Sequence, residues 1–492
     1  MEPAPMEWLR LDPRSMLTQP VAVLRNAALP VLAALFGIGT AGGLSLLLIP
    51  AGLVVAVAIG LVPWLTTTYR VTPTHLEVRR GLLQRSTVTA RLDRIRSVDL
   101  EANPLHRVLG LTTVAVGTGV DDGQIDLDAL AVGAAERLRS ALLHGGTGEA
   151  PAAPTTVEIA RLDWSWVRFA PLNVANLAIV AVAAGAVVGQ LSDVFGSVID
   201  PEEGQGAWEW AQRVGVPLLV VGVIFAVLVL WIPLSCVGYA VRWFGLTVTR
   251  ETTESGTTIR RVHGALTQRA TTVEEAKVRG ATLTTPLLVG VAGGTQLSLL
   301  TTGLEDNEPD VLPAAPRGVA ERVAADVLVE ADAMTAALTG HGARTRRRYQ
   351  LRAQLPAWLL TLVSVAATVA LRLADFGAPV WFPVVVYVVV SSLAAAEAEL
   401  RWRRLGHALT DRYLVVRTGA LRTRRVALES DGIVGWRLRQ SFFDRRRGLA
   451  QLIATTAAGP EQVTIPDVPL ETAIELAARA TPKIVSHRLA RP

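Results

Sequence analysis

The sequence predicts a membrane protein with six transmembrane helices in three hairpins and three α+β domains, each an antiparallel sheet closed by a C-terminal helix. Three observations support this fold class. One pattern of residues occurs three times along the chain. A long uncharged region precedes each copy. Hydrophobic residues make up 50% of the chain and charged residues only 18%, so whole stretches lack charge.

The repeat has a glycine, a β-branched residue 14 positions later and a second glycine 15 positions after that. Apolar and polar residues alternate around the first glycine, which predicts strands, and residues 131–143 then change to helical spacing. The second copy is degenerate and carries an insertion at residues 252–258. The three copies lie too far apart along the chain for a solenoid, so the recurrence indicates a repeated domain. The positions that define the repeat are predicted to be structural: Gly81, Ile95, Gly110, Gly264, Val278, Gly293, Gly419, Ile433 and Gly448.

The uncharged regions have the length of membrane hairpins. Residues 26–69 form a run of 44 residues without a charge, and a transmembrane helix needs about 20 apolar residues. The second pair of runs is 170–192 and 214–241, with tryptophans near the ends, as expected at a membrane interface. The third pair is 353–371 and 376–396.

These patterns divide the chain into ten segments. They are a cytoplasmic N-terminal segment (1–20), hairpin 1 (21–66), domain 1 (67–145), a linker (146–163), hairpin 2 (164–241) with an acidic outer loop (193–213), a degenerate domain 2 (242–340), a basic linker (341–352), hairpin 3 (353–400), domain 3 (401–485) and a tail (486–492).

Charge predicts the orientation in the membrane. The net charge is +5, carried almost wholly by arginine. Arginines flank hairpin 3 on the domain side, whereas the loop 193–213 is acidic, so the positive-inside rule places the domains in the cytoplasm of a multi-pass cell-membrane protein. The juxtamembrane basic residues either orient the helices or bind anionic lipid. They are Arg344, Arg346, Arg347, Arg348, Arg401, Arg403 and Arg404.

A second candidate surface lies inside domain 3, where topology accounts less well for the charges. Aromatic and basic residues adjoin there, and they form either a partner- or lipid-binding surface or a solvated turn: Phe442, Phe443, Arg445, Arg446 and Arg447.

Nothing in the sequence indicates catalysis. Cys236 is the single cysteine, and the seven histidines are scattered without a metal-binding spacing. We therefore expect no catalytic, cofactor-binding or metal-binding residues and no enzyme activity. The chain also lacks a nucleic-acid-binding motif, so no nucleic-acid partner is expected.

The repeat resembles the bacterial pleckstrin-homology-like (bacterial PH) family. The motifs that carry the resemblance are Ile95-Arg96-Ser97-Val98 and Val108-Leu109-Gly110-Leu111. Three copies, each after a membrane hairpin, are similar to the YdbT type of membrane protein. The resemblance implies a bent antiparallel sheet capped by a C-terminal helix, and it implies neither catalytic residues nor cofactors.

The expected function is that of a non-catalytic scaffold or adaptor. It would bind a partner, either a smaller membrane protein with the same type of domain or a second copy of itself, by strand- or groove-mediated capture. A contribution to envelope stress or antimicrobial-peptide resistance is implied by the resemblance alone. The alternative is the recognition or handling of anionic lipid at the inner leaflet.

Overall fold

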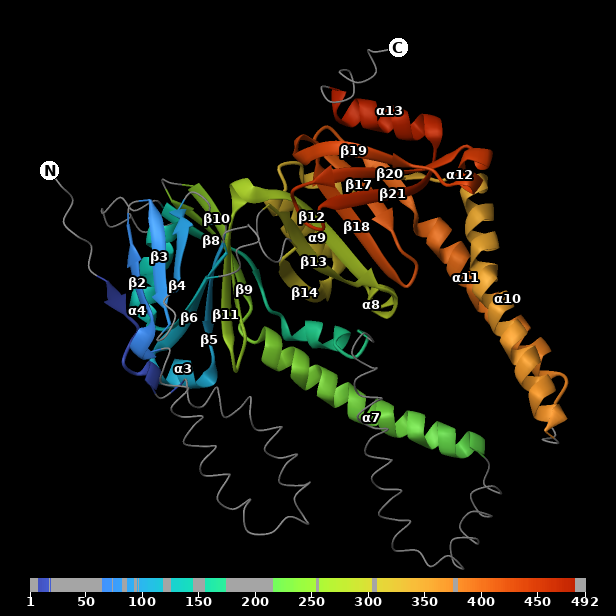
Figure 1. Ribbon diagram of the computed structural model, residues 1–492, viewed down its shortest axis with the longest axis horizontal. Coiled ribbons are helices and arrows are strands. Elements are labelled where there is room, and N and C mark those ends of the chain that lie inside the picture. Colours follow the sequence, from blue (N-terminus) through green and yellow to red (C-terminus); the bar gives the residue numbers. More distant parts are fainter. Residues whose placement is uncertain are drawn as a thin grey trace, which may run out of the picture. The chain divides into compact units, whose positions relative to one another are not determined.

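The computed structural model describes residues 8–16, 18, 64–72, 74–81, 86–92, 95, 97–117, 125–144, 155–173, 216–253, 256–302, 308–374 and 379–482. The chain forms two compact units (Figure 1). Unit 1 comprises Met1–Leu162, Arg242–Arg279 and Thr301–Pro309, and unit 2 comprises Asp163–Val241, Gly280–Leu300 and Asp310–Pro492. The second repeat is therefore divided between the two units, and the predicted domain bounds stay a prediction.

Unit 1 contains two antiparallel sheets. The first has the order β1-β2-β3-β4, formed by β1 (Leu9–Arg10), β2 (Thr68–Val71), β3 (His75–Arg80) and β4 (Ser86–Arg91). The second has the order β7-β6-β5-β11-β10-β9-β8, formed by β5 (Ser97–Ala102), β6 (Leu111–Gly117), β7 (Ile125–Ala131), β8 (Thr155–Arg161), β9 (Thr247–Thr253), β10 (Gly256–His263) and β11 (Gln268–Glu274). Helix α3 (Pro104–Leu109) joins β5 to β6, α4 (Val132–His144) follows β7, and η4 (Glu275–Lys277) follows β11.

Unit 2 repeats this arrangement. One sheet has the order β14-β13-β12-β18-β17-β16-β15, formed by β12 (Val278–Pro286, whose first two residues belong to unit 1), β13 (Gly294–Thr301), β14 (Asp310–Pro316), β15 (Thr339–Gly340), β16 (Gly406–Leu409), β17 (Tyr413–Thr418) and β18 (Arg422–Glu429). The other has the order β19-β20-β21, formed by β19 (Ile433–Arg439), β20 (Leu449–Thr456) and β21 (Gln462–Pro469). The helices are η2 (Trp164–Phe169), α7 (Val216–Trp243), α8 (Leu287–Val291), α9 (Arg317–Val327), η5 (Ala331–Met334), α10 (Ala343–Leu373), α11 (Phe382–Arg404), η6 (Ser430–Gly432), α12 (Phe442–Arg447) and α13 (Leu470–Ala480).

The two seven-stranded sheets are each built from two neighbouring repeats. In unit 1, β5 of the first repeat pairs with β11 of the second, and we call this pairing the first junction. In unit 2, β12 of the second repeat pairs with β18 of the third, which is the second junction. The three separate sheets predicted from the sequence are therefore wrong, because strand edges that a single repeat would leave unpaired form hydrogen bonds with the next repeat.

The two junctions have the same register. Leu100 lies opposite Ala270 in the first, and Leu283 lies opposite Arg425 in the second. Each leucine stands five residues after the β-branched position of its repeat, and each partner stands six residues after its turn glycine. Because a slip of one residue would turn every side chain to the other face, the shared register shows that both junctions use one mode of association.

The glycines of the repeat occupy backbone conformations that other residues rarely adopt. The turn glycines Gly81, Gly264 and Gly419 have φ of 104°, 114° and 102°. A Cβ on Gly264 would lie 2.0 Å from the carbonyl oxygen of Thr267. The closing glycines Gly110, Gly293 and Gly448 also have positive φ, and the carbonyl of each accepts a hydrogen bond from the first residue of the following helix: Val132, Arg317 and Leu470.

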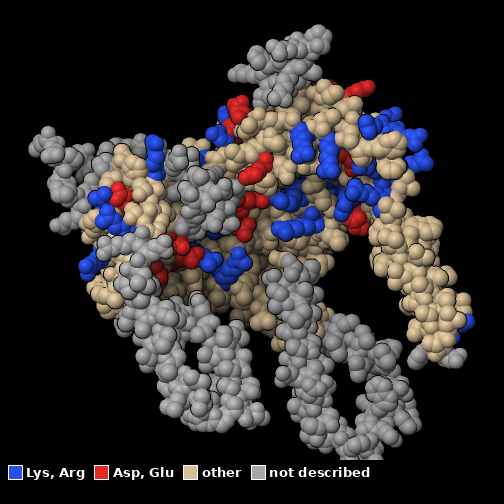
Figure 2. Space-filling model, viewed as in Figure 1, with Lys and Arg blue, Asp and Glu red and all other residues tan. Residues whose placement is uncertain are grey.

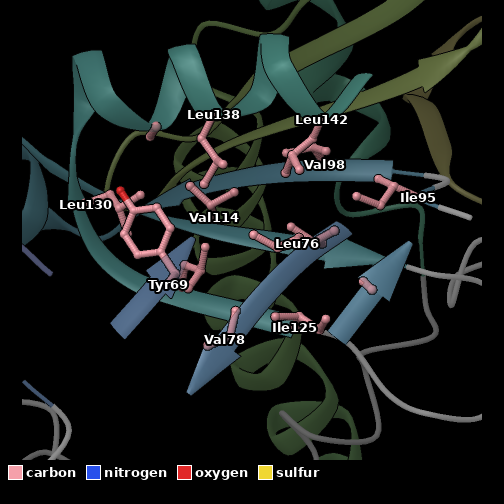
Figure 3. Close-up of a cluster of buried hydrophobic side chains, with 14 of the residues drawn as sticks. Tyr69, Leu76, Val78, Ile95, Val98, Val114, Ile125, Leu130, Leu138 and Leu142 are labelled. Carbon is pink, nitrogen blue, oxygen red and sulfur yellow. The ribbon is translucent and has the colours of Figure 1, made fainter. Parts of the chain in front are cut away.

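The core of each unit lies between its sheets and helices. In unit 1 the buried residues of β3, β6 and β7 meet Leu138 and Leu142 of α4, which point toward the strands in Figure 3. Ile95, the β-branched residue of the first repeat, is 3% exposed in this core. Its equivalent Ile433 is also 3% exposed, in the corresponding core of unit 2 beneath α13.

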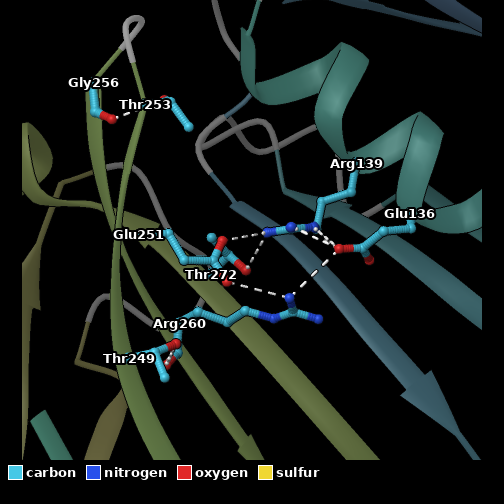
Figure 4. Close-up of polar contacts among 8 residues, drawn as sticks. All are labelled: Glu136, Arg139, Thr249, Glu251, Thr253, Gly256, Arg260 and Thr272. Carbon is cyan, nitrogen blue, oxygen red and sulfur yellow. Dashed lines mark hydrogen bonds and ion pairs between the residues drawn. The ribbon is translucent and has the colours of Figure 1, made fainter. Parts of the chain in front are cut away.

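An ion-pair network strengthens the contact between the first two repeats (Figure 4). Arg139 of α4 lies between Glu136 on its own helix, at 2.7 Å, and Glu251 of β9, at 3.5 Å. Arg260 of β10 also pairs with Glu251, at 3.3 Å. The Arg139 and Glu251 side chains are only 10% and 12% exposed, so the pair between them is little screened by solvent, whereas Glu136 is 41% exposed.

The prediction of six transmembrane helices is wrong for the residues that the structure describes. Among them, α10 and α11 alone are long and apolar enough to cross a membrane. Side chains of α7 are described mainly in its C-terminal part, and that apolar stretch, Val227–Trp243, is shorter than a span. There Trp231 is buried and donates a hydrogen bond to the carbonyl of Pro171, so part of the apolar run is covered by protein. Hairpin 1 and most of hairpin 2 lie outside the described residues.

Helices α10 and α11 pack against each other through polar and aromatic contacts. Ser391 donates a hydrogen bond of 2.7 Å to the side-chain oxygen of Gln354, and Trp358 packs edge-on against Tyr387. Only 17% of the most apolar 18-residue segment of α10 and 11% of that of α11 is buried, so the apolar side chains of both helices mostly face outward. This exposure distinguishes them from core helices of a soluble domain and indicates membrane association.

Candidate binding surfaces

Helix α12 presents the aromatic and basic surface predicted for the third repeat. Phe442 and Phe443 are 59% and 64% exposed, and their rings meet edge to face at 5.6 Å. The guanidinium of Arg446 lies 5.7 Å from the centre of the Phe442 ring, while Arg445 and Arg447 extend from the same short helix. The structure therefore brings these five residues together at one protruding turn.

The turn is held rigidly at both ends. The Ser441 hydroxyl accepts a hydrogen bond from the Asp444 backbone, and the Asp444 carboxylate accepts one from the Ser441 backbone. Gly448 ends the helix in the left-handed conformation, with φ of 66°. Because both ends of α12 are capped, Phe442 and Phe443 project from a helical turn of defined backbone conformation.

Arg348, one of the seven juxtamembrane arginines, has a structural position. Its guanidinium pairs with Asp444 at 2.8 Å and also with Asp467, and the three side chains are 15% exposed or less. Burial opposes ionisation of Asp444, but the hydrogen bonds from Ser441 and the charge of Arg348 hold the pKa of this carboxyl below its usual range. This pairing fixes the start of α10 to the third repeat.

The other juxtamembrane arginines differ in their contacts. Arg346 and Arg403 both pair with Glu399, at 2.8 and 2.9 Å, and Arg401 pairs with Glu397. Arg404 donates hydrogen bonds to the carbonyl of Ala420 and to Thr423. Arg344 and Arg347 are exposed, and Figure 2 shows Lys and Arg side chains gathered over this part of unit 2. Within the sequence-defined cluster, Arg346, Arg401 and Arg403 are therefore exposed although they are paired with carboxylates, whereas Arg348 is largely buried.

A groove of about 650 Å³ separates α12 from the start of α10. Phe443, Leu351 and Leu355 contribute apolar side chains to its lining, and the polar lining includes arginines from α10, α12 and β19: Arg348, Arg352, Arg447 and Arg439. The groove combines an apolar wall with positive charge at the domain end of α10.

Among the end strands of the described sheets, β4 and β19 are equivalent to strands that pair at the two junctions, and sequence reasoning did not single them out. β4 ends the first sheet of unit 1, and β19 ends the last sheet of unit 2. Among the described strands, neither has a partner on its outer side. β4 is the equivalent of β11 and β18, whereas β19 is the equivalent of β5 and β12. The open edges are therefore the two complementary halves of a further junction.

The side chains of β19 are accessible. Val434 is 70% exposed and Leu438 is 44% exposed, and Leu438 is the equivalent of Leu100 and Leu283 at the two formed junctions. Exposed β-branched and apolar residues on an edge strand are a template for pairing with another chain. The sequence already showed that Leu438 is equivalent to Leu100 and Leu283, but it did not show that this position pairs with a strand of the neighbouring repeat.

Two buried histidines lie in the segments that adjoin α10 and α11 at their domain ends. His341 and His407 approach at 3.0 Å between ring nitrogens, and burial lowers the pKa of His341 to about 4 and also lowers the pKa of His407. Within the described ranges, no group of three or more His, Cys, Asp or Glu side chains is placed to hold a metal ion. Because burial lowers the pKa of both rings, the two histidines pack as neutral imidazoles at neutral pH.

Comparison with protein families supports the resemblance for two of the three repeats. A family model of the bacterial PH domain matches residues 27–145 and 359–483, together just under half of the chain. These matches contain the first and third repeats, and such domains indicate a binding or scaffold role. No curated protein and no solved structure matches the chain.

Proposed function

We propose that this protein is a non-catalytic membrane scaffold that captures a further copy of its own repeat, carried by another polypeptide, at an open strand edge. The observation that supports the proposal is that one mode of pairing occurs twice within the chain, in one register, while the equivalent edges of β4 and β19 have no further partner among the described strands. The partner that fits is a smaller membrane protein with a bacterial PH domain. A second copy of this chain has the same edge.

In this proposal the second repeat is a third copy of the same domain, as in the YdbT type of protein. The closing glycine of each repeat accepts the same backbone hydrogen bond, and Gly264 has the conformation of Gly81 and Gly419. These shared features support the equivalence although the family model does not match the second repeat.

The formed junctions show what a third would require. The paired segment is about seven residues long in β12 and β18, so the backbone supplies most of the contact. At the first junction Glu101 adds an ion pair of 2.9 Å with Arg269. Backbone pairing provides affinity, and side chains such as Leu438 provide the register, which is the general basis of strand addition.

The membrane would restrict where capture occurs. We propose that α10 and α11 anchor unit 2 in the cell membrane, with the domains cytoplasmic because arginines gather at the domain end of both helices. A partner anchored in the same membrane meets the open edge at high effective concentration. A role in envelope stress or antimicrobial-peptide resistance belongs to the same proposal.

The experiment is purification in a mild detergent from the native membrane, followed by mass spectrometry of retained proteins. The wild-type chain should retain a membrane protein that carries the repeat, or a second copy. The double variant Val434→Asp, Leu438→Glu should lose about tenfold or more of this partner, because charges on the edge oppose strand addition. The control Phe442→Ala, Phe443→Ala leaves the edge intact and should retain it.

Two results would overturn the proposal. One is a wild-type chain that retains no repeat-containing protein. The other is an edge variant that retains the partner as well as the control does. A selectively retained anionic lipid without a protein partner would favour lipid handling instead.

A further inference from the structure

Unit 2 contains a pocket lined by four arginines at the second junction. Its volume is about 210 Å³, below the roughly 300 Å³ at which pockets begin to hold drug-sized ligands. The arginines come from four separate elements, α9, α11, β17 and β18, and threonine hydroxyls line the same pocket. The polar lining includes Arg317, Arg404, Arg417, Arg425, Thr295 and Thr423.

Two of these arginines are direct cross-strand neighbours. Arg417 of β17 lies opposite Arg425 of β18 in the sheet register. Like charges directly opposite each other destabilise a sheet. Such a pair persists in a folded protein when another group compensates the charge.

The groups in contact with these arginines do not provide that compensation. Arg425 donates to the carbonyl of Ala336, at 2.6 Å, and Arg417 donates to the carbonyl of Arg404, at 2.7 Å. The Nε of Arg425 is buried and has no hydrogen-bond partner among the described residues. Carbonyl oxygens orient guanidinium groups but do not neutralise them.

Within the described residues, one carboxylate pairs with this cluster. Glu321 contacts Arg317, at 2.7 Å, so four guanidinium groups face one carboxylate. Burial and the neighbouring arginines lower the pKa of Arg417 and of Arg425. The pocket therefore has an excess of positive charge that an anion would balance.

The first junction shows that the fold does not need these charges. Its equivalent cross-strand pair is Val262 and Ala270, in the same register as Arg417 and Arg425. The equivalent of Arg317 is Val132, the first residue of α4. The same sheet thus forms with apolar residues at three of the four positions, and the arginines require another explanation.

We infer that this pocket binds a phosphate group. Guanidinium groups bind phosphate oxygens through paired hydrogen bonds, and four of them with adjacent hydroxyls complement the negative charge and the several acceptor oxygens of a phosphate group. The inference is independent of the strand-capture function, since it concerns the inner face of a junction that is already formed.

The setting of the pocket allows two sources of phosphate. Arg404 is the last residue of α11, at its domain end. Helix α8 contributes Leu287 and Gly290 to the lining of the pocket, and its Leu288 (44%) and Val291 (81%) are exposed. Exposed apolar residues on a helix that lines the pocket suit the acyl chains of a lipid whose headgroup carries the phosphate, while the pocket volume also accommodates free phosphate.

The test uses the full-length protein and the variant Arg417→Val, Arg425→Ala, which places the residue pair of the first junction into the second. The first measurement is thermal unfolding in detergent during titration with inorganic phosphate, at constant ionic strength maintained with chloride. The second is thermal unfolding in nanodiscs of phosphatidylglycerol compared with phosphatidylcholine. The control is Arg479→Ala, which removes a 67% exposed arginine of α13.

The wild-type protein and the control should show a saturable rise in melting temperature with phosphate, with phosphatidylglycerol, or with both. In the variant the apparent affinity should fall about 10- to 100-fold, as expected for the loss of charge-assisted hydrogen bonds. Without phosphate the variant should melt at the same temperature or higher, because the repulsion is gone. A response to phosphate alone identifies a free phosphate compound, and a response to phosphatidylglycerol alone identifies a lipid.

The inference is overturned if neither source raises the melting temperature, if chloride is equally effective, or if the variant responds as the control does. Should the double variant fail to fold, Arg425→Gln keeps the polar side chain and removes one charge, and the same comparison applies to it.

Discussion

Arg348→Met should detach the start of α10 from the third repeat. In the folded protein Arg348 pairs with Asp444 and Asp467, and the side chains of the two carboxylates are 8% and 10% exposed. The substitution would leave both carboxylates buried without their partner. Breaking a buried ion pair from one side costs about 3–5 kcal/mol.

This cost converts to a measurable shift in melting temperature. For a unit of about 150–250 residues, 1 kcal/mol corresponds to roughly 2–4 °C, so Arg348→Met should lower the melting temperature in detergent by about 10 °C. The matched control is Arg347→Met, which removes the neighbouring exposed arginine and should change the stability by less than about 0.5 kcal/mol.

Two further measurements separate the ion pair from a loss of packing. Adding Asp444→Asn and Asp467→Asn to Arg348→Met should restore much of the stability, because no buried charge then remains. Because the pKa of Asp444 is depressed, its contribution is present above its unfolded pKa of about 4 and is lost as the pH falls through the lower folded value. Equal melting temperatures for Arg348→Met and Arg347→Met would refute the reasoning and leave Arg348 without a structural role that separates it from the other juxtamembrane arginines.

Two other predictions concern the turn glycine and the histidine pair. Gly264→Ala places a Cβ 2.0 Å from a carbonyl oxygen at a φ of 114°, so it should lower the free energy of unfolding by about 1–3 kcal/mol or more. The control Gly318→Ala in α9 adds a Cβ with no atom within 4 Å and should be neutral or stabilising. Equal effects of the two substitutions would contradict this account. Lowering the pH from 7 to 5 should destabilise unit 2 by about 2 kcal/mol, because His341 binds a proton at about pH 6.5 when unfolded but only at about pH 4 when folded, and that stability is lost as the pH falls. A melting curve of His341→Phe, His407→Phe should show a smaller pH effect, and an unchanged effect would assign it to other groups.

The shared register of the two junctions, together with the proposed strand capture, predicts how complexes of this chain would grow. A repeat that closes its sheet against the next repeat leaves one open edge at each end of the row. Head-to-tail pairing of this type does not close on itself unless the geometry permits a ring. The number of repeats in a complex would then depend on which partners supply the missing edges, which native mass spectrometry can count.

Several features followed from the sequence alone because they depend on local chemistry. The spacing of Gly81, Ile95 and Gly110 recurs because a turn, a buried strand residue and a left-handed closing turn each admit few residue types. The bacterial PH domain, predicted from this spacing, is confirmed for the first and third repeats. The apolar runs of α10 and α11 are also local signals, and both form long helices with exposed apolar sides.

Tertiary structure decided what local chemistry leaves open. An uncharged run has the same composition whether it faces lipid or protein, so composition alone does not decide which runs span a membrane. The prediction of six transmembrane helices was wrong, because among the described residues only α10 and α11 are long and apolar enough to cross one. Arg348 belongs by sequence to a basic cluster, yet two buried carboxylates more than 90 residues away determine its role. Arg317, Arg417 and Arg425 form no cluster in the sequence: Arg417 and Arg425 meet across the β17–β18 pair, and the pairing of β12 with β18 adds Arg317 from the second repeat. Which edges pair between repeats, and in which register, depends on contacts between residues far apart in the sequence. These pairings form the pocket and leave the edges of β4 and β19 without a partner among the described strands.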